Sequence, residues 1–234
     1  MSDLSAAFPL ALSLIVQADA TLLSTVWLSL GVSLLAVFAA SVIGLPLGAS
    51  VALGRFPGRA GLTVMFNAFM GLPPVVVGLV VYLLLSRAGP LGDLGLLFTP
   101  SAMVVAQTIL VLPIITALTR QVIDDLWEEY GEQLRSLGCT PLRAIPTLLW
   151  DGRYRLATVV LAGFGRASAE VGAVMIVGGN IAGVTRTMTT SIALQTGRGD
   201  LPLALAFGFI LILLTTAVNG LTYLVGDVAR RGMR

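Results

Sequence analysis

The sequence predicts an all-α protein that crosses a membrane several times. Of its 234 residues, 56% are hydrophobic and only 11% are charged, whereas a soluble domain is about 25% charged. A helix needs roughly 20 apolar residues to cross about 30 Å of hydrocarbon. Four uncharged runs are long enough, namely Ala20–Gly54, Ala60–Ser86, Leu94–Thr119 and Leu201–Gly226.

A fifth apolar run, Leu156–Thr185, contains two charged residues, Arg166 and Glu170. If the membrane tolerates that pair, the chain has five core transmembrane helices within a domain that covers residues 20–226. Residues 227–234 then form a short tail. Because five is an odd number, the two ends of this domain lie on opposite sides of the membrane.

Residues 1–19 form a separate N-terminal segment. Its uncharged part, residues 4–18, is shorter than the roughly 20 residues of a full span. The segment also lacks the basic start of a cleaved signal peptide. We therefore expect an interfacial helix here. Insertion of residues 4–18 as a sixth span stays open, and it would move the N-terminus to the other side.

The arginines predict how the spans are oriented. One set of connecting segments holds Arg55, Arg59, Arg120, Arg135, Arg143, Arg153, Arg155, Arg230, Arg231 and Arg234, and the other set holds Arg87, Arg186 and Arg198. Cytoplasmic loops carry the excess of basic residues. We therefore expect a multi-pass protein of the cytoplasmic (inner) membrane, with its N-terminus outside and its C-terminus in the cytoplasm.

Several residue types are absent, and their absence excludes classes of function. All 14 basic residues are arginine, so the chain has no lysine for a phosphate-binding P-loop and no histidine for acid–base catalysis or metal binding. Its one cysteine forms no disulfide framework. A net charge of +2 is too small to indicate a nucleic-acid partner. We expect no metal site, no cofactor held by this chain, and no enzyme activity.

Residues 120–155 form the one large loop on the cytoplasmic side. Its acidic residues recur at helical spacing, which is typical of a solvated helix face. Gly138 is suited to end that helix in a left-handed conformation, and Thr140 with Pro141 is suited to start another. We expect Pro146 to limit this second helix. A short helix held here is well placed to dock into a partner.

Arg166 and Glu170 lie four residues apart, which places them on one face if the helix is continuous. Each charge alone would be unfavourable inside the membrane, so one interpretation is mutual neutralisation. The other is that they line a polar pathway or gate, together with the nearby Ser168. Small residues around the pair indicate close helix packing.

Two further segments interrupt the apolar runs. Pro73 and Pro74 break the second run, because proline frees backbone carbonyls and bends a helix. The segment from Asn180 to Asp200 is predicted to be a polar external loop. Asn180 and Thr185 within it are candidates for the external mouth of a pathway.

The cytoplasmic loop resembles a motif of ABC-importer permeases. Glu132-Gln133-Leu134-Arg135-Ser136-Leu137-Gly138 is similar to their Glu-Ala-Ala motif, which has a glycine after three further residues. Glu132 and Gly138 match, while Gln133 and Leu134 replace the alanines and a later proline is missing. The resemblance implies that Glu132, Gln133, Leu134, Gly138, Thr140 and Pro141 form a coupling loop for an ATPase subunit.

A second stretch resembles the permeases for molybdate, sulfate and tungstate. Glu170-Val171-Gly172-Ala173-Val174-Met175-Ile176-Val177-Gly178-Gly179-Asn180-Ile181 looks like the tungstate-type branch, as do residues 70–79 and 98–100. The resemblance implies the MetI-like fold of type I importers and a homodimer with the pathway at its interface. It also implies cytoplasmic ATPases that bind ATP and Mg, and an external solute-binding protein.

The combined interpretation is the transmembrane subunit of an ATP-driven tungstate importer that works by alternating access. Import of molybdate or sulfate is the alternative within the same class. A proton-coupled secondary transporter that uses Glu170 and a membrane enzyme that uses the Arg166–Glu170 pair are the alternatives outside it. Dependence of uptake on ATP separates the importer from the secondary transporter.

Overall fold

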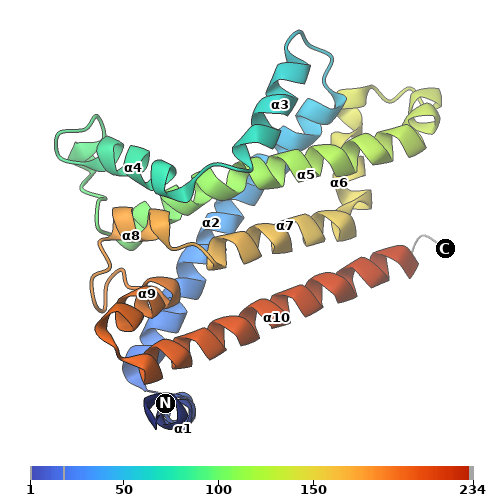
Figure 1. The fold of residues 1–234 in the computed structure, drawn as a ribbon. Coiled ribbons are helices and arrows are strands. Elements are labelled where there is room, and N and C mark those ends of the chain that lie inside the picture. Colours follow the sequence, from blue (N-terminus) through green and yellow to red (C-terminus); the bar gives the residue numbers. More distant parts are fainter. Residues whose placement is uncertain (1, 18, 232–234) are drawn as a thin grey trace. The chain divides into compact units, whose positions relative to one another are not determined.

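The computed structural model describes residues 2–17 and 19–231, and in that part of the chain it contains helices and no strand (Figure 1). The α-helices are α1 (Ser2–Val16), α2 (Ala20–Leu53), α3 (Arg59–Phe69), α4 (Pro74–Leu85), α5 (Pro100–Ser136), α6 (Ile145–Asp151), α7 (Arg153–Ser168), α8 (Gly172–Gly178), α9 (Met188–Arg198) and α10 (Leu201–Arg231). Two short 3₁₀ helices, η1 (Gly92–Leu94) and η2 (Pro141–Ala144), lie in connections.

The predicted spans correspond to two kinds of helix. Among the described residues, α2, α5 and the first part of α10 are each long and apolar enough to cross a membrane as one helix. The pairs α3 with α4 and α7 with α8 pass the same test only together, because each pair bends at a short break. Counting each bent pair as one crossing gives the five spans that the sequence predicts.

The described residues near both ends of the chain are also helical. Helix α1 has 15 residues and is about 22 Å long, so it does not reach across about 30 Å of hydrocarbon. The predicted tail begins inside α10, which continues to Arg231. Residues 1 and 18 of the N-terminal segment and residues 232–234 of the tail lie outside the described residues.

The fifth apolar run is not one continuous helix, contrary to the sequence prediction. Helix α7 ends at Ser168 and α8 begins at Gly172. Glu170 lies in the break, where its Oε1 accepts a hydrogen bond from the backbone N–H of Ala173 at 3.1 Å. Its side chain therefore serves the start of α8, and the prediction that Arg166 and Glu170 share one helical face is wrong.

The segment after α8 contains a helix that the sequence did not predict. Helix α9 begins after Thr187, whose side chain caps it in a reciprocal pair with Thr190. It ends at Gly199, whose φ of 80° is left-handed. Because threonine hydroxyls satisfy the first free N–H groups of a helix, the threonine-rich stretch that indicated a loop is here a helix start.

The chain divides into two compact units. Unit 1 comprises Met1–Ala36, Pro73–Gln107 and Ala167–Ala217, and unit 2 comprises Val37–Leu72, Thr108–Arg166 and Val218–Arg234. In unit 1, Leu22, Met188 and Phe207 join α2, α9 and α10 in one apolar cluster. In unit 2, Leu53, Ile123 and Leu148 join α2, α5 and α6 in another.

Close packing in unit 2 depends on a glycine in α2. A Cβ added at Gly48 would lie 2.5 Å from the carbonyl oxygen of Thr116 and 2.8 Å from the Cβ of Thr119, both in α5. Only a residue without a side chain lets the two helix backbones approach so closely. A Cβ added at Gly31, also in α2, would meet no atom within 4 Å.

We expect Gly48→Ala to lower the free energy of unfolding by about 1–3 kcal/mol, because the added methyl group forces α2 and α5 apart. Gly31→Ala is the matched control and should be neutral or stabilising by up to about 1 kcal/mol, since alanine favours a helix. Thermal unfolding in detergent measures both. Equal unfolding temperatures for the two variants would contradict the close approach.

Candidate functional site

The predicted coupling loop is built around a helix end in unit 2. Gly138 has a φ of 78°, its N–H donates to Arg135 O, and the N–H of Cys139 donates to Leu134 O. These two bonds are those of a Schellman motif, which satisfies the last carbonyls of a helix. Leu134 and Cys139 pack against the apolar cluster of unit 2. The helix end predicted at Gly138 is confirmed.

A new helix then starts at the position that the sequence predicts, but without the predicted side-chain cap. Thr140 precedes η2 in an extended conformation and Pro141 is its first residue, although the Thr140 side chain makes no capping bond. Pro146 lies in the first turn of α6. Helix η2, which starts at Pro141, ends at Ala144, so it stops before Pro146 as predicted. Helix α6 follows directly, because a first turn needs no N–H donor from its proline.

The segment from the end of α5 through η2 to α6 exposes large apolar side chains. Leu137 is 82% exposed, Leu142 61% and Trp150 72%, while Glu132 and Gln133 beside them are exposed polar residues. These side chains are candidates for contact with another protein, although the guanidinium of Arg153 lies over the Trp150 ring, 5.1 Å from its centre. Leu142 and Trp150 were not predicted, because apolar residues in a mostly apolar chain give no distinct signal.

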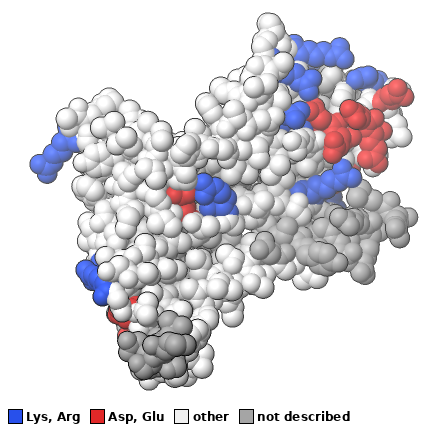
Figure 2. Space-filling view, viewed as in Figure 1, with Lys and Arg blue, Asp and Glu red and all other residues white. Residues whose placement is uncertain are grey.

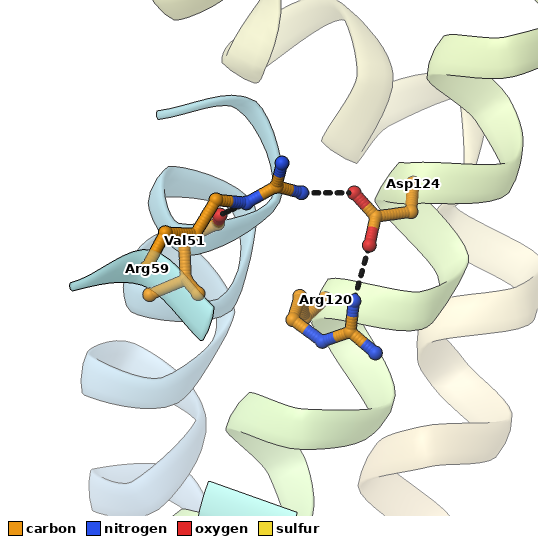
Figure 3. Close-up of polar contacts among 4 residues, drawn as sticks. All are labelled: Val51, Arg59, Arg120 and Asp124. Atoms are coloured by element: carbon orange, nitrogen blue, oxygen red, sulfur yellow. Dashed lines mark hydrogen bonds and ion pairs between the residues drawn. The ribbon is translucent and has the colours of Figure 1, made fainter. Parts of the chain in front are cut away.

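A charged cluster connects three segments of unit 2 (Figure 3). The guanidinium of Arg59 donates through Nε to the carbonyl of Val51 at 2.8 Å and through an Nη2 contact of 2.9 Å to Asp124 Oδ1. Arg120, one turn earlier on α5, pairs with the other carboxylate oxygen. Asp124 therefore joins the end of α2 and the start of α3 to α5.

This cluster changes the interpretation of the acidic helix face. The sequence indicated a solvated face, and Asp125, Glu128 and Glu129 are indeed exposed. Figure 2 shows acidic side chains gathered with basic ones at the end of the molecule where α5 and α6 lie. Asp124 differs, because it holds two arginines and contributes to the fold.

Glu170 lies at a polar cavity inside unit 1. It is 4% exposed, and the cavity of about 10 Å³ is lined also by Ser29, Ser33, Gln107 and Ser168, which is room for about one water molecule. Gln107 Oε1 and Ser168 Oγ are buried and have no hydrogen-bond partner among the described residues. A bound water would supply those bonds.

The break around Glu170 is held by side chains from other elements of unit 1. Thr189 donates its hydroxyl to the carbonyl of Glu170 at 2.8 Å, and Gln107 donates to the carbonyl of Ala167 at 3.2 Å. The N–H of Met188 donates to Ser29 Oγ at 2.8 Å. Arg166 is half-buried in the last turn of α7, within unit 2.

Two other predicted residues lie after α8. Thr185 is fully buried, and its hydroxyl donates to Gly178 O at 2.6 Å and accepts from Ile181 N at 2.9 Å. Both of its roles are therefore structural in this conformation. Asn180 has a left-handed φ of 51°, and its Oδ1 is buried without a partner in the described structure.

The prolines interrupt the second span as predicted. Helix α3 ends at Phe69, Pro73 is extended, and Pro74 opens α4. The Pro73 carbonyl accepts hydrogen bonds from Val76 and Val77. Within unit 1, α4 then packs on α8, where a Cβ at Gly78 would lie 2.8 Å from the Cα of Ala173.

Comparison with known sequences connects this site to a class of transporter. Residues 42–231 match the family described as binding-protein-dependent transport system inner membrane component. The tungstate uptake system permease protein TupB of Peptoclostridium acidaminophilum is 38% identical over 95% of this chain and 98% of its own length. The sulfate transport system permease protein CysT of Salmonella typhimurium is 30% identical over 77% of this chain and 69% of its own length.

A solved structure has the same fold. A chain of the MetNI methionine ABC transporter, in an inward-facing conformation, superposes with a TM-score of 0.63 and 18% identity. The superposition covers 91% of this chain and 96% of the other. The all-α, MetI-like fold of a type I importer permease, which the sequence predicted, is confirmed.

We expect Asp124→Asn to lower the free energy of unfolding by about 1 kcal/mol, because it weakens two charge-assisted bonds at a partly exposed site. Asp125→Asn removes the same charge from an exposed neighbour and should change stability by less than about 0.5 kcal/mol. Thermal unfolding of both variants is the measurement. If Asp125→Asn destabilises the chain as much as Asp124→Asn, the cluster has no specific role.

Proposed function

Because the chain belongs to the family of binding-protein-dependent transport system inner membrane components, we propose that it is the membrane-spanning subunit of an ATP-driven importer for tungstate. It is a multi-pass inner-membrane permease and is not itself an enzyme. The observation that supports tungstate as the substrate is the 38% identity, over nearly the full length of both chains, to a tungstate uptake permease. Sulfate permeases are less similar and match a smaller part of the chain.

The coupling loop, within residues 120–155, gives this assignment a physical basis. The chain has no lysine with which to build a phosphate-binding loop, so the energy comes from another subunit. A cytoplasmic ATPase that binds ATP and Mg²⁺ would dock on the surface formed by Leu137, Leu142 and Trp150. Residues 132–134, 138, 140 and 141 shape the turn that presents this surface.

The charged cluster of Arg59, Arg120 and Asp124 connects that surface to other helices of unit 2. A movement of the docked loop reaches α5, and Asp124 passes it to Arg59 at the start of α3. Arg59 in turn donates to the carbonyl of Val51 at the end of α2. The packed cluster of unit 2 adds apolar contacts between the same helices. Rigid packed elements of this kind shift as a unit rather than deform.

The pathway itself belongs to a homodimer in this proposal, with the N-terminus outside and the C-terminus in the cytoplasm. The arginine distribution supports the orientation. Candidates for the pathway or gate are Pro73, Pro74, Arg166, Ser168, Glu170, Asn180 and Thr185. Gln107 and Ser168, beside Glu170, each have a buried polar atom without a partner among the described residues, which favours water or another polar species in that cavity. An external solute-binding protein would deliver and select the anion.

Two alternatives to tungstate import driven by ATP are distinguished by experiment: a different anion, and coupling to protons. Molybdate and sulfate are dianions of the same shape, so a permease that contacts them in passing discriminates weakly. A proton-coupled transporter would have to titrate Glu170, whose carboxylate accepts the hydrogen bond that starts α8. That carboxylate therefore already has a structural role at the start of α8, which disfavours its use as a cycling proton site.

The function is tested by uptake into proteoliposomes that contain this chain, its ATPase and its solute-binding protein. We expect tungstate uptake that requires internal ATP and persists when the proton gradient is collapsed. Molybdate and sulfate should compete only at higher concentrations. Uptake that follows the proton gradient without ATP would replace the importer by a secondary transporter, and preferred uptake of sulfate would change the substrate.

The docking surface is tested by Leu142→Asp. A carboxylate at this exposed position disfavours burial in a protein interface, so we expect at least a tenfold loss of ATPase co-purifying with the tagged chain. Leu94→Asp, at another exposed leucine in a connection, should leave the yield unchanged. Undiminished recovery of the ATPase with Leu142→Asp would show that the docking surface lies elsewhere.

A further inference from the structure

A pocket of about 280 Å³ lies in unit 1, apart from the coupling loop and from the cavity at Glu170. Its lining includes Asp19, Arg186, Ser191, Gln195, Asp200 and Phe207. The volume is close to the lower end of pockets that hold small molecules. Its lining combines the apolar Leu203 and Phe207 with charged and hydroxyl groups, so it suits a ligand that is polar at one end and apolar at the other.

The position of the pocket relative to the membrane follows from its helices. Asp19 directly precedes α2, and Asp200 directly precedes α10, and both helices begin candidate spans at Ala20 and Leu201. The other lining residues from these helices lie within their first two turns. If α2 and α10 enter the hydrocarbon at these ends, the pocket lies where water meets hydrocarbon, at the depth of lipid headgroups.

Two polar groups of the pocket lack partners that a ligand would supply. Ser191 is 1% exposed, and its Oγ has no hydrogen bond in the described structure. Arg186 donates through Nη2 to Asn180 O at 3.3 Å, but its buried Nε has no acceptor there. A guanidinium and a hydroxyl with free donors are typical of a phosphate-binding site.

The carboxylates add the opposite charge. Asp19 Oδ1 accepts from the N–H groups of Thr21 and Leu22, and Asp200 Oδ1 accepts from Leu203 N. The second oxygen of each makes no hydrogen bond within the described residues. With two carboxylates and one guanidinium, the pocket has a negative formal charge, which disfavours a free oxyanion. In Figure 2 basic and acidic side chains come to the surface near one another where Figure 1 draws α9.

We propose that this pocket binds the headgroup of a phosphatidylethanolamine molecule from the surrounding membrane. The phosphodiester lies against Arg186 and Ser191, the ammonium group donates to Asp19 and Asp200, and the glycerol end contacts Phe207. A zwitterion satisfies both signs of charge, whereas tungstate satisfies only one. The site holds the starts of α2, α9 and α10 together in the bilayer. The proposal does not depend on which solute is transported.

The test is lipid retention by the complete transporter purified in mild detergent, measured by native mass spectrometry after adding defined lipids. We expect phosphatidylethanolamine to be retained about tenfold more than phosphatidylcholine, whose quaternary ammonium has no N–H donor, and more than phosphatidylglycerol, which has no cation. Loss of one hydrogen bond to a charged group corresponds to about tenfold in affinity. Water-soluble phosphoethanolamine should not compete, because it lacks the apolar end.

Variants connect that retention to the pocket. Arg186→Gln and Asp200→Asn should each reduce retained phosphatidylethanolamine about tenfold. Asparagine still caps the start of α10, so Asp200→Asn keeps the fold. Arg87→Gln removes an exposed arginine outside the pocket and should change nothing.

Three outcomes would overturn the proposal. Equal retention of the three lipids means that the headgroup is not recognised. Unchanged retention in Arg186→Gln and Asp200→Asn means that the lipid binds elsewhere. If Arg186→Gln leaves lipid retention intact but weakens binding of the solute-binding protein, the pocket is a protein interface. Loss of ATP-driven uptake is a separate readout, so failure of the proposed transport function is distinguishable from each of these.

Discussion

The structure depends on one constraint, which is that every backbone polar group away from water must find a hydrogen bond within the protein. Long helices meet it by themselves, and α2, α5 and α10 do so along most of their lengths. The constraint becomes demanding where a helix stops. In unit 1, α7, α8 and α9 end or begin within about 20 residues of one another, and side chains take over. Glu170, Thr185 and Thr189 each bond to a backbone group freed by a break.

These side chains therefore have a structural function whatever else they do. Thr185 uses its hydroxyl as donor and acceptor for the turn after α8, which leaves little for a passing solute. Gln107 is different, because its amide nitrogen is used while its oxygen is free toward a cavity. The buried polar side chains are thus of two kinds here. Some use their polar atoms to bond backbone groups, and others keep a donor or acceptor that could bond a water molecule or a solute.

The sequence predicted what depends on composition and local chemistry. Long uncharged runs indicated the spans, and Gly138 indicated the helix end, because few residues other than glycine adopt a left-handed φ at low energy. The pairing of Arg59 with Asp124 could not be predicted, since 65 residues separate them and only tertiary packing brings them together. Helix α9 was missed because threonine is typical of both loops and helix caps. The continuous face assumed for Arg166 and Glu170 failed because a carboxylate can start a new helix as well as pair with a cation.

The helix end at Gly138 has a consequence for how this protein can be observed. The residue that follows the bend is Cys139, half-buried, and it is the one thiol of the whole chain. A maleimide dye or spin label would therefore attach at a single position without any engineered cysteine, at the surface proposed to meet the ATPase. The native chain thus carries its own reporter, whose spectrum responds when that surface becomes covered.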